Sequence, residues 1–439
     1  MVTYDTDYDL AILGGSVDSR FAACRAAQKG ARVALIAPNW RASDRTYYVL
    51  QALRAWPLDS KTDWSSLRAW IRHRCNYPTF SSTTLSTQGV DVISEPASFT
   101  QGGRLQLDSR SLKASRYLLT DGYTLSSLTI DQGLFCGQLT QLAKIPKRIA
   151  VVGYGATVLE WAYALSHRAT VTLIWRGASL LPAEDHDIRR LAEAQLKGLG
   201  IKLLSLSDCL EGKDSQLDAK MLDVDLLVVV PQPYKWEAMS LKAVGIVGEP
   251  IPVNCYLQTA HPKIYVSGGS LGGENRAELT CQETSIALEN ALFKRSRIMR
   301  YERSFYSIEL LSPVGRWGLT EYQARQRYGQ DIMVGQASSL PSMTDQVCQT
   351  NFCKLIVRGA HLVGVHLMGE GSPNLAATLG SRPRLHTLSR WAMATFESGT
   401  LAEAVYQAIA NLQNQRWQPG QWRRDWAENW FNLRRSWDG

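Results

Sequence analysis

The sequence predicts an α/β protein with two Rossmann-like dinucleotide-binding domains and a C-terminal α+β domain. Two segments carry this prediction, because each combines an apolar run, a glycine-containing turn, a helix with small residues and a second apolar run. The first is "YDLAILGGSVDSRFAACRAAQKGARVALIAP", and the second is "KRIAVVGYGATVLEWAYALSHRATVTLIWRG". Such a strand–turn–helix–strand unit, present twice in one chain, indicates two dinucleotide-binding folds.

Shorter patterns predict the remaining elements in order. Residues 40–75 have a helical pattern, and residues 88–120 have the pattern of short strands joined by polar turns. After the second unit, "DLLVVVPQ" predicts a buried strand, and "HPKIYVSGGSLGG" predicts a strand that ends in a glycine-rich turn. The rest of the chain predicts a helix from about Cys281 to Phe293, strands near 306–311, 332–336 and 352–368, and helices near 385–397 and 401–413.

The composition is that of an ordinary globular protein. Of the 439 residues, 45% are hydrophobic and 20% are charged, which is enough apolar material for several cores. The start of the chain is polar, and no apolar stretch reaches the roughly 20 residues that span a bilayer. We therefore expect a cytoplasmic protein, at most peripheral to a membrane. Eight scattered cysteines fit a reducing compartment, and the pair Cys348 and Cys353 is interpreted as structural.

Four blocks, in this order and spacing, resemble the pyridine nucleotide–disulfide oxidoreductase family, which includes glutathione reductase, dihydrolipoamide dehydrogenase and mercuric reductase. "YDLAILGGSVDSR" resembles the flavin fingerprint, and "PKRIAVVGYGATVLEWA" resembles the nicotinamide fingerprint. "NCYLQTAHPKIYVSGGSLGG" is similar to the second flavin segment, and "WGLTEYQARQRYG" to the entry of the dimerisation domain. The resemblance implies a homodimer with an FAD-type domain at 1–145 and 255–300, an NAD(P)H-type domain at 146–254, a dimerisation domain at 301–415 and a tail at 416–439.

The flavin fingerprint is incomplete. Gly14 and Gly15 begin it, but Ser16 and Ser19 replace the second and third glycines of G-x-G-x-x-G. Asp18 lies at the start of the helix, where a carboxylate can itself cap the free N–H groups. It would also repel a pyrophosphate at about 4 Å by about 1–4 kcal/mol. The sequence therefore predicts a helix that is capped by its own side chain.

Other flavin and redox positions of the family are also changed. Gly268 and Gly269 stand where the family has Gly-Asp, so the aspartate that binds the ribityl chain is missing. The segment "NWRASDRTYYVLQALRAW", where the resemblance places two redox cysteines, contains none, which excludes disulfide reduction at this site. His386 is interpreted as a structural residue, since no His-x-His-Pro stretch follows. We therefore expect FAD to be weakly bound or absent.

The nicotinamide fingerprint is better kept. Gly153 and Gly155 hold its first two glycine positions, and Glu160 stands where the family has an acid. Val158 replaces the third small residue and is expected to push the helix away from the strand. Arg176 follows the second strand, where an arginine suits the 2′-phosphate of NADP(H). The alternative is an inherited motif that binds no ligand.

The last segment, "RWQPGQWRRDWAENWFNLRRSWDG", lies outside the family fold. Its tryptophans recur at helical spacing on one face, and arginines flank that face. Three roles are open: a helix that docks on its own body, a site for a partner protein, or a membrane-surface helix. Similar tails on cyanobacterial relatives would indicate a thylakoid setting. The predicted interaction residues are Trp422, Arg423, Arg424, Trp426, Trp430, Arg434, Arg435 and Trp437.

Two functions follow from these patterns. The leading hypothesis is a pseudoenzyme, a homodimeric scaffold that keeps the reductase fold and binds a partner or a membrane through its tail. The alternative is an NAD(P)H-dependent FAD oxidoreductase that acts without a redox cysteine pair. An NADP(H)-sensing module is a third possibility. Nucleic-acid binding is not expected, because the basic residues cluster in one short tail without a recognition module.

Overall fold

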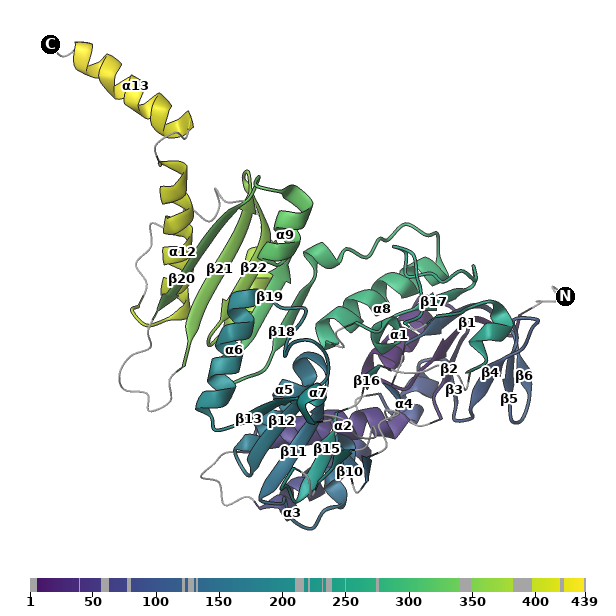
Figure 1. Cartoon of the computed structure of the whole chain (residues 1–439). Coiled ribbons are helices and arrows are strands. Elements are labelled where there is room, and N and C mark those ends of the chain that lie inside the picture. Colours follow the sequence, from purple (N-terminus) through teal and green to yellow (C-terminus); the bar gives the residue numbers. More distant parts are fainter. Residues whose placement is uncertain are drawn as a thin grey trace. The chain divides into compact units, whose positions relative to one another are not determined.

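The computed structural model divides the chain into two compact units. One consists of Met1–Ala183 and Ala194–Arg300, and the other of Glu184–Glu193 and Tyr301–Gly439. Figure 1 labels the helices and strands of both units. The structure describes residues 6–38, 40–56, 63–76, 80–120, 123–124, 130–131, 133–209, 217–219, 222–230, 232–233, 239–248, 250–273, 276–339, 349–381, 397–418 and 422–437.

The first unit contains a parallel sheet built around the first apolar run of the sequence. Residues 10–13 pair in parallel with residues 33–36 on one side and with residues 116–119 on the other. The strand order is β17-β7-β1-β2-β3. The strands are β1 (Tyr8–Leu13), β2 (Val33–Ile36), β3 (Val90–Ile93), β7 (Ala114–Leu119) and β17 (Ile264–Val266), and the helices that accompany them are α1 (Val17–Gln28), α4 (Ser82–Thr87) and α8 (Ala277–Leu292).

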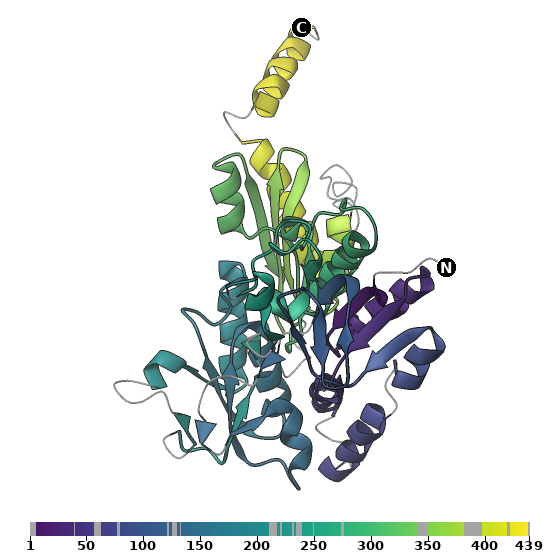
Figure 2. The ribbon, with the colours of Figure 1, turned by 90° about the vertical axis from the view of Figure 1, so that its right-hand side faces the viewer.

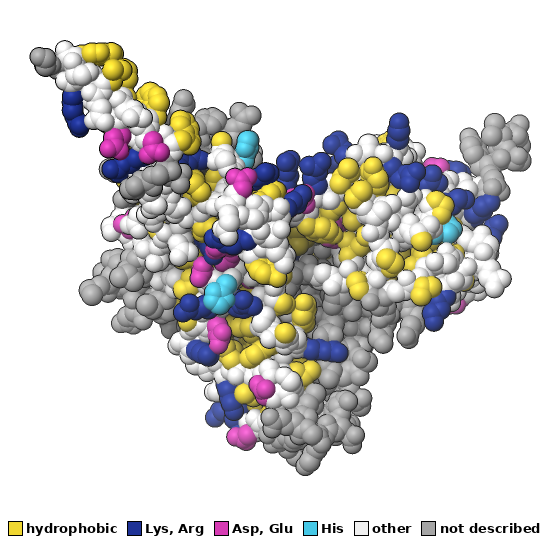
Figure 3. All heavy atoms as spheres, turned by 45° about the horizontal axis from the view of Figure 1, so that its top comes forward, with side chains coloured by type: hydrophobic (Ala, Val, Ile, Leu, Met, Phe, Trp, Pro, Cys, Tyr) yellow, Lys and Arg dark blue, Asp and Glu magenta, His cyan; other side chains and the backbone are white. Residues whose placement is uncertain are grey.

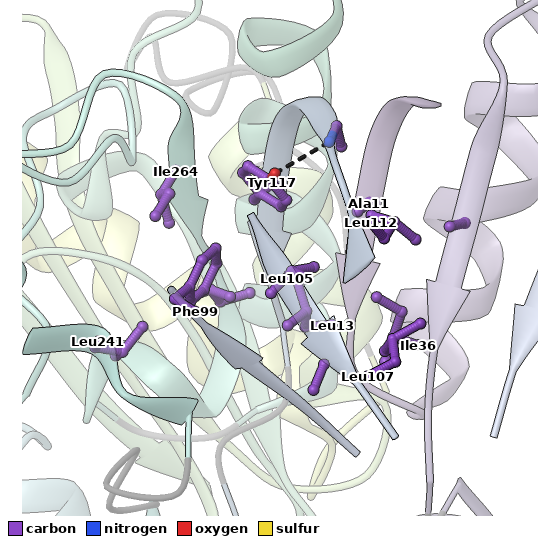
Figure 4. Close-up of a cluster of buried hydrophobic side chains, with 14 of the residues drawn as sticks. Ala11, Leu13, Ile36, Phe99, Leu105, Leu107, Leu112, Tyr117, Leu241 and Ile264 are labelled. Carbon is purple, nitrogen blue, oxygen red and sulfur yellow. Dashed lines mark hydrogen bonds between the residues drawn. The ribbon is translucent and has the colours of Figure 1, made fainter. Parts of the chain in front are cut away.

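Side chains of this sheet alternate between two apolar cores, as the period of two in a strand requires. Leu10 and Ile12 pack with alanines and leucines of α1 and α8. Ala11 and Leu13 face the opposite core, which a three-stranded antiparallel sheet covers (Figure 4). In that core the Tyr117 hydroxyl donates to the Gly103 carbonyl at 2.8 Å. The covering strands are β4 (Ala97–Phe99), β5 (Leu105–Leu107) and β6 (Ser111–Leu112).

A second parallel sheet in the same unit follows the second predicted βαβ segment. Its order is β10-β15-β11-β12-β13, and Gly153 at the end of β11 pairs with Trp175 at the end of β12. The strands are β10 (Gly133–Phe135), β11 (Arg148–Gly153), β12 (Thr170–Trp175), β13 (Lys202–Ser205) and β15 (Leu226–Val229). The associated helices are α2 (Trp40–Arg54), α3 (Trp64–Asn76), α5 (Gly155–Ser166) and α7 (Leu206–Cys209), and two strand pairs join β8 (Tyr123–Thr124) to β16 (Gln232–Pro233) and β9 (Ile130–Asp131) to β14 (Leu217–Asp218).

The second unit is an antiparallel sheet in the order β18-β19-β22-β21-β20, with helix α12 beside it (Figures 1 and 2). Apolar residues of α12 recur every three or four positions and pack against Cys353, Leu355 and Val357. The strands are β18 (Phe305–Ile308), β19 (Val314–Gly318), β20 (Met333–Ser339), β21 (Asn351–Arg358) and β22 (His361–Met368). The helices are α9 (Glu321–Tyr328), α10 (Ser372–Ser381), α12 (Leu401–Arg416) and α13 (Trp422–Trp437), and α6 (His186–Gly198) begins in this unit.

Helix α10 approaches this sheet where glycines leave room. A Cβ atom on Gly315 would overlap the backbone of Ser372 at the start of α10. A Cβ atom on Gly380 would overlap the Trp317 ring. At Gly315 helix and sheet therefore meet backbone to backbone, and at Gly380 the helix backbone packs directly on the Trp317 ring of β19.

These elements confirm the predicted fold class of two Rossmann-type sheets with an α+β domain. Some element predictions were wrong. The 352–368 region is a hairpin of β21 and β22 rather than a single stretch, because the chain turns at Gly359, where φ is +58°. Helix α8 begins at Ala277, before the predicted Cys281. The predicted helix at 385–397 and His386 lie outside the described residues, and the domain boundaries remain a prediction.

A buried charge cluster fixes the start of α6 to the sheet of the second unit. The Lys354 ammonium, 3% exposed, lies 2.9 Å from Asp185 Oδ1, 2.8 Å from Asp187 Oδ2 and 2.6 Å from Glu321 Oε2. Burial raises the pKa of Asp185, but its interactions with His366, Lys354 and the Glu321 N–H outweigh this effect, and its pKa lies below the ordinary value. The cluster therefore stabilises the unit while its carboxylates are ionised.

Replacement of Lys354 by methionine is expected to destabilise the second unit by about 3–5 kcal/mol, because buried carboxylates lose their counter-charge. A carboxyl group with a lowered pKa stabilises the fold above its ordinary pKa of about 4 and loses this contribution as the pH falls through the folded-state value. The variant should therefore unfold at a higher pH than the parent in an acid titration followed by circular dichroism. Lys294→Met, at an exposed lysine, is the control, and equal acid midpoints would contradict the prediction.

Candidate functional site

The turn between β1 and α1 is held by hydroxyl groups. Gly14 has a φ of +150°, and the Ser16 side chain caps α1 by accepting from the Ser19 N–H at 3.3 Å. The Ser19 hydroxyl lies 2.7 Å from that of Thr120, whose hydroxyl donates to the Leu13 carbonyl at 3.1 Å. The serines that replace two fingerprint glycines therefore join β1, α1 and β7 at the carboxyl ends of the strands.

The interpretation of Asp18 as the helix cap was wrong. Ser16 is the N-cap, and Asp18 lies inside the helix as its second residue. Asp18 lines a groove between α1 and α8 together with Arg25 and Cys281. Burial, and after it the Asp18 carboxylate, raises the pKa of Cys281, which is consistent with this placement. Asp18 therefore remains an acid in the first turn of α1, on the side of the helix that faces α8.

A buried arginine instead brings positive charge to the turn. Arg20 is 1% exposed, and its Nε donates to the Gly15 carbonyl at 2.9 Å. A guanidinium is always charged in proteins and is well suited to phosphate groups. The sequence analysis missed Arg20, because a single arginine in a helix usually lies at the surface.

The second glycine-rich turn follows β17 and lies at the same edge of the first sheet. A Cβ on Gly268 would lie 2.8 Å from the Thr120 carbonyl oxygen, and its φ of +65° also favours glycine. The Gly268 N–H donates to Glu283 Oε2 at 2.8 Å, and Gly269 is buried. The Ser270 hydroxyl is buried, and no described residue forms a hydrogen bond with it. Such a hydroxyl suits a polar ligand group in place of the missing aspartate. The sequence analysis missed Ser270, although it directly follows the two predicted glycines.

The nicotinamide-type turn keeps its glycine geometry. Gly155 has a φ of +66°, and the preceding N-cap residue, Tyr154, makes no side-chain cap. A Cβ on Gly153 would lie 3.2 Å from the Val158 side chain. Val158 therefore fills the space left free by this glycine, and it can be accommodated without pushing helix α5 away from strand β11. Arg176 is exposed, and its backbone N–H donates to the Gly153 carbonyl at 2.8 Å. The structure thus brings Gly153, Gly155 and Arg176 to one edge of the second sheet.

Glu160, the acid of the nicotinamide fingerprint, is buried between two arginines. Its carboxylate is buried and accepts from Arg276 Nη1 at 3.0 Å and from Nη2 at 2.6 Å. Arg54 Nη2 lies 3.1 Å from the same carboxylate. Glu160 on α5 therefore forms an ion group with the N-cap residue of α8 and the last residue of α2.

The helix at the position of the family's redox cysteines carries no thiol. No cysteine occurs in the sequence between Cys24 and Cys75, and α2 lies in this interval. Cys136 is hydrogen-bonded to the Thr46 side chain of α2, but burial raises the pKa of Cys136 to about 12. A protonated thiol is a poor nucleophile and a poor disulfide partner. Cys353 is likewise a free, buried thiol, whereas Cys348 lies outside the described residues.

The predicted interaction residues of the tail all lie on α13. The side chains of Trp422, Trp426, Trp430 and Trp437 are between 42% and 71% exposed. Within the second unit, the tryptophan face of α13 is therefore exposed. Among the described residues, no helix combines the length and apolar character needed to cross a bilayer, and no group of three or more His, Cys, Asp or Glu could hold a metal.

Two parallel sheets, each with a glycine-rich turn into a helix, together with an antiparallel third sheet, define an α/β protein of the two-nucleotide type. A family model described as pyridine nucleotide-disulphide oxidoreductase matches residues 8–288. The chain belongs to this family.

Individual proteins agree with this assignment. The chain is 29% identical over 211 residues to a dihydrolipoyl dehydrogenase of Bacillus subtilis (strain 168), covering 45% of each protein. It is 25% identical over 308 residues to a mercuric reductase of Lysinibacillus sphaericus, covering 64% of this chain and 56% of the relative. The chain thus spans about half the length of these relatives. The HOCl-induced flavoprotein disulfide reductase RclA from Escherichia coli shares the fold, with a TM-score of 0.71, 19% identity, and coverage of 92% of this chain and 99% of that chain.

The expectation that FAD is weakly bound or absent was wrong. Members of this family, including proteins of the kinds matched here, are FAD-binding flavoproteins. The expectation left out Arg20, which adds a positive charge beside Gly15, and Ser270, whose buried hydroxyl follows the two glycines that replace the Gly-Asp pair. These two residues fit an anionic nucleotide at the edge of the first sheet.

Removal of Arg276 tests the ion group around Glu160. Arg276→Met should destabilise the first unit by about 3 kcal/mol, because the buried Glu160 carboxylate would lose its two-bond partner, and Arg54 is the more exposed of the two arginines. The double variant Glu160→Gln/Arg276→Met removes both charges and should recover most of this loss. Urea unfolding of the three proteins measures the difference, and a double variant as unstable as the single one would contradict the prediction.

Proposed function

We propose that this chain is an FAD-dependent NAD(P)H oxidoreductase that acts without a redox cysteine pair, as a homodimer. One observation carries the proposal: the glycine turns before α1 (Gly14) and before α5 (Gly155) keep a backbone geometry that suits a nucleotide, whereas α2 has no cysteine. Disulfide reduction needs a thiolate pair beside the flavin, so this chain would pass electrons to another kind of acceptor.

The proposed roles of the residues follow from their positions. Helix α1, Gly15 and Arg20 would hold the FAD pyrophosphate, because helix N-termini and guanidinium groups both attract phosphate. Ser270 would donate to or accept from the ribityl chain through its otherwise unused hydroxyl. FAD, when bound, supplies hydride acceptance and onward electron transfer.

The nicotinamide nucleotide would bind at the edge of the second sheet. The N-terminus of α5, at Gly155, would receive its pyrophosphate, because helix N-termini attract phosphate groups. The exposed Arg176 can pair with a 2′-phosphate, which favours NADP(H) over NAD(H). In the overall reaction, the hydride of NAD(P)H and one proton would reduce a two-electron acceptor.

A second candidate function is a dimeric scaffold that acts through its tail, and the exposed tryptophans of α13 favour it. The two functions differ in one property. An oxidoreductase must be reduced by the nicotinamide nucleotide, whereas a scaffold can keep its flavin oxidised.

Purified full-length protein, saturated with FAD and freed of excess, should show the oxidised-flavin band and lose it anaerobically with NADPH. Ser270→Ala should weaken FAD binding about tenfold through one lost hydrogen bond, as measured by fluorescence titration. Ser86→Ala, at an exposed serine of α4, is the control.

Arg176→Ala should lower the preference for NADPH over NADH without changing FAD binding. A flavin band that neither NADPH nor NADH bleaches would refute the oxidoreductase and favour the scaffold. Protein that retains no flavin after reconstitution would refute the proposed FAD site.

A further inference from the structure

Helix α13 carries one continuous stripe of indole rings. Trp422, Trp426, Trp430 and Trp437 recur at intervals of four, four and seven residues, which places them within about 80° of arc on an α-helix. Trp426 stacks on Trp430 with ring centroids 6.2 Å apart, and Trp430 meets Trp437 edge-on at 6.0 Å. Leu433 lies in the same arc and is 47% exposed.

The charges of α13 are sorted around this stripe. At 100° per residue, Arg423 and Arg434 lie directly beside it, about 60–80° from its centre. Arg424 and Arg435 lie on the opposite face. Asp425 and Glu428 lie on the other flank and behind it, so arginines border one side of the stripe without an acid between them. Figure 3 shows the apolar side chains along one side of the helix and charged side chains along the other.

We propose that α13 is a membrane-surface helix that lies in the headgroup region of an anionic lipid bilayer. Tryptophan prefers the boundary between water and hydrocarbon, where its ring is buried and its N–H stays hydrated. Arginines next to the stripe can extend from the apolar layer to lipid phosphates. A wide apolar stripe bordered by arginines, opposite a face that is polar apart from Phe431, is the pattern of a helix that lies in the interface without crossing it.

The chemistry of the stripe disfavours a second copy of the chain as its occupant. Helices that pair through such a seam use Ile, Val and Leu in close knobs-into-holes contacts. Four indole rings are too large for such contacts, and the proposal therefore commits to lipid. The surface is independent of the flavin chemistry proposed above.

Co-sedimentation of the full-length protein with lipid vesicles tests this assignment. We expect binding to vesicles of phosphatidylcholine with about one third phosphatidylglycerol, little binding to phosphatidylcholine alone, and release as salt is raised, because surface charge is screened. Trp426→Ser/Trp430→Ser should weaken binding tenfold or more by removing the centre of the stripe.

The four arginines provide a matched pair of variants. Arg423→Gln/Arg434→Gln removes two charges beside the stripe and should weaken binding about tenfold or more, since each arginine at an anionic surface contributes about fivefold. Arg424→Gln/Arg435→Gln removes the same charge from the opposite face and should have a smaller effect. Equal thermal melting curves would show that each variant is folded.

The outcomes separate the possible occupants. Absence of binding to anionic vesicles, or binding that the tryptophan variant leaves unchanged, would overturn the proposal. A change of oligomeric state in size-exclusion chromatography, without a change in vesicle binding, would assign the stripe to a second copy instead. If both arginine double variants lost the same amount of vesicle binding, the helix would be attracted to the surface by charge without a preferred orientation, and the proposal would also be overturned.

Discussion

The buried carboxylate of Glu160 is the constraint on which the first unit depends. A charge removed from water needs compensating partners, and Arg276 and Arg54 supply them from α8 and α2. Three helices that follow different parts of the sequence are thereby tied at one point, next to the glycine-rich turn that leads into α8. Glu160, the acid of the nicotinamide fingerprint, thus ties α5 to α2 and α8 in this chain.

The flavin-side turns show how a changed motif can keep its geometry. Hydroxyl groups of Ser16, Ser19 and Thr120 form a connected set where the fingerprint has glycines. Arg20 places a guanidinium at the start of α1, where it adds to the positive end of the helix dipole and offsets the negative charge of Asp18. The losses seen in the sequence are thus partly offset by residues that no fingerprint includes.

The sequence predicted the parts of the fold that depend on local periodicity. Both βαβ units were found because a strand such as 10–13 is continuously apolar and its helix carries small residues on one face. The burial of Arg20 and Ser270 could not be predicted, since it is set by segments that lie far apart in the sequence. Asp18 was misassigned because the cap is two residues earlier, at Ser16, and a shift of two residues turns a side chain to another face of the helix.

The two glycines at the contact between α10 and β19, Gly380 in the helix and Gly315 in the strand, limit how the second unit can vary in sequence. Where helix and sheet touch backbone to backbone, or backbone to ring, even one added methyl group has no space to enter. At a buried position with a side chain, a larger residue can be compensated by a smaller neighbour, but Gly315 and Gly380 contact backbone or a ring that cannot shrink in this way. We therefore expect these two positions to remain glycine in related sequences, even where the surface residues around them vary.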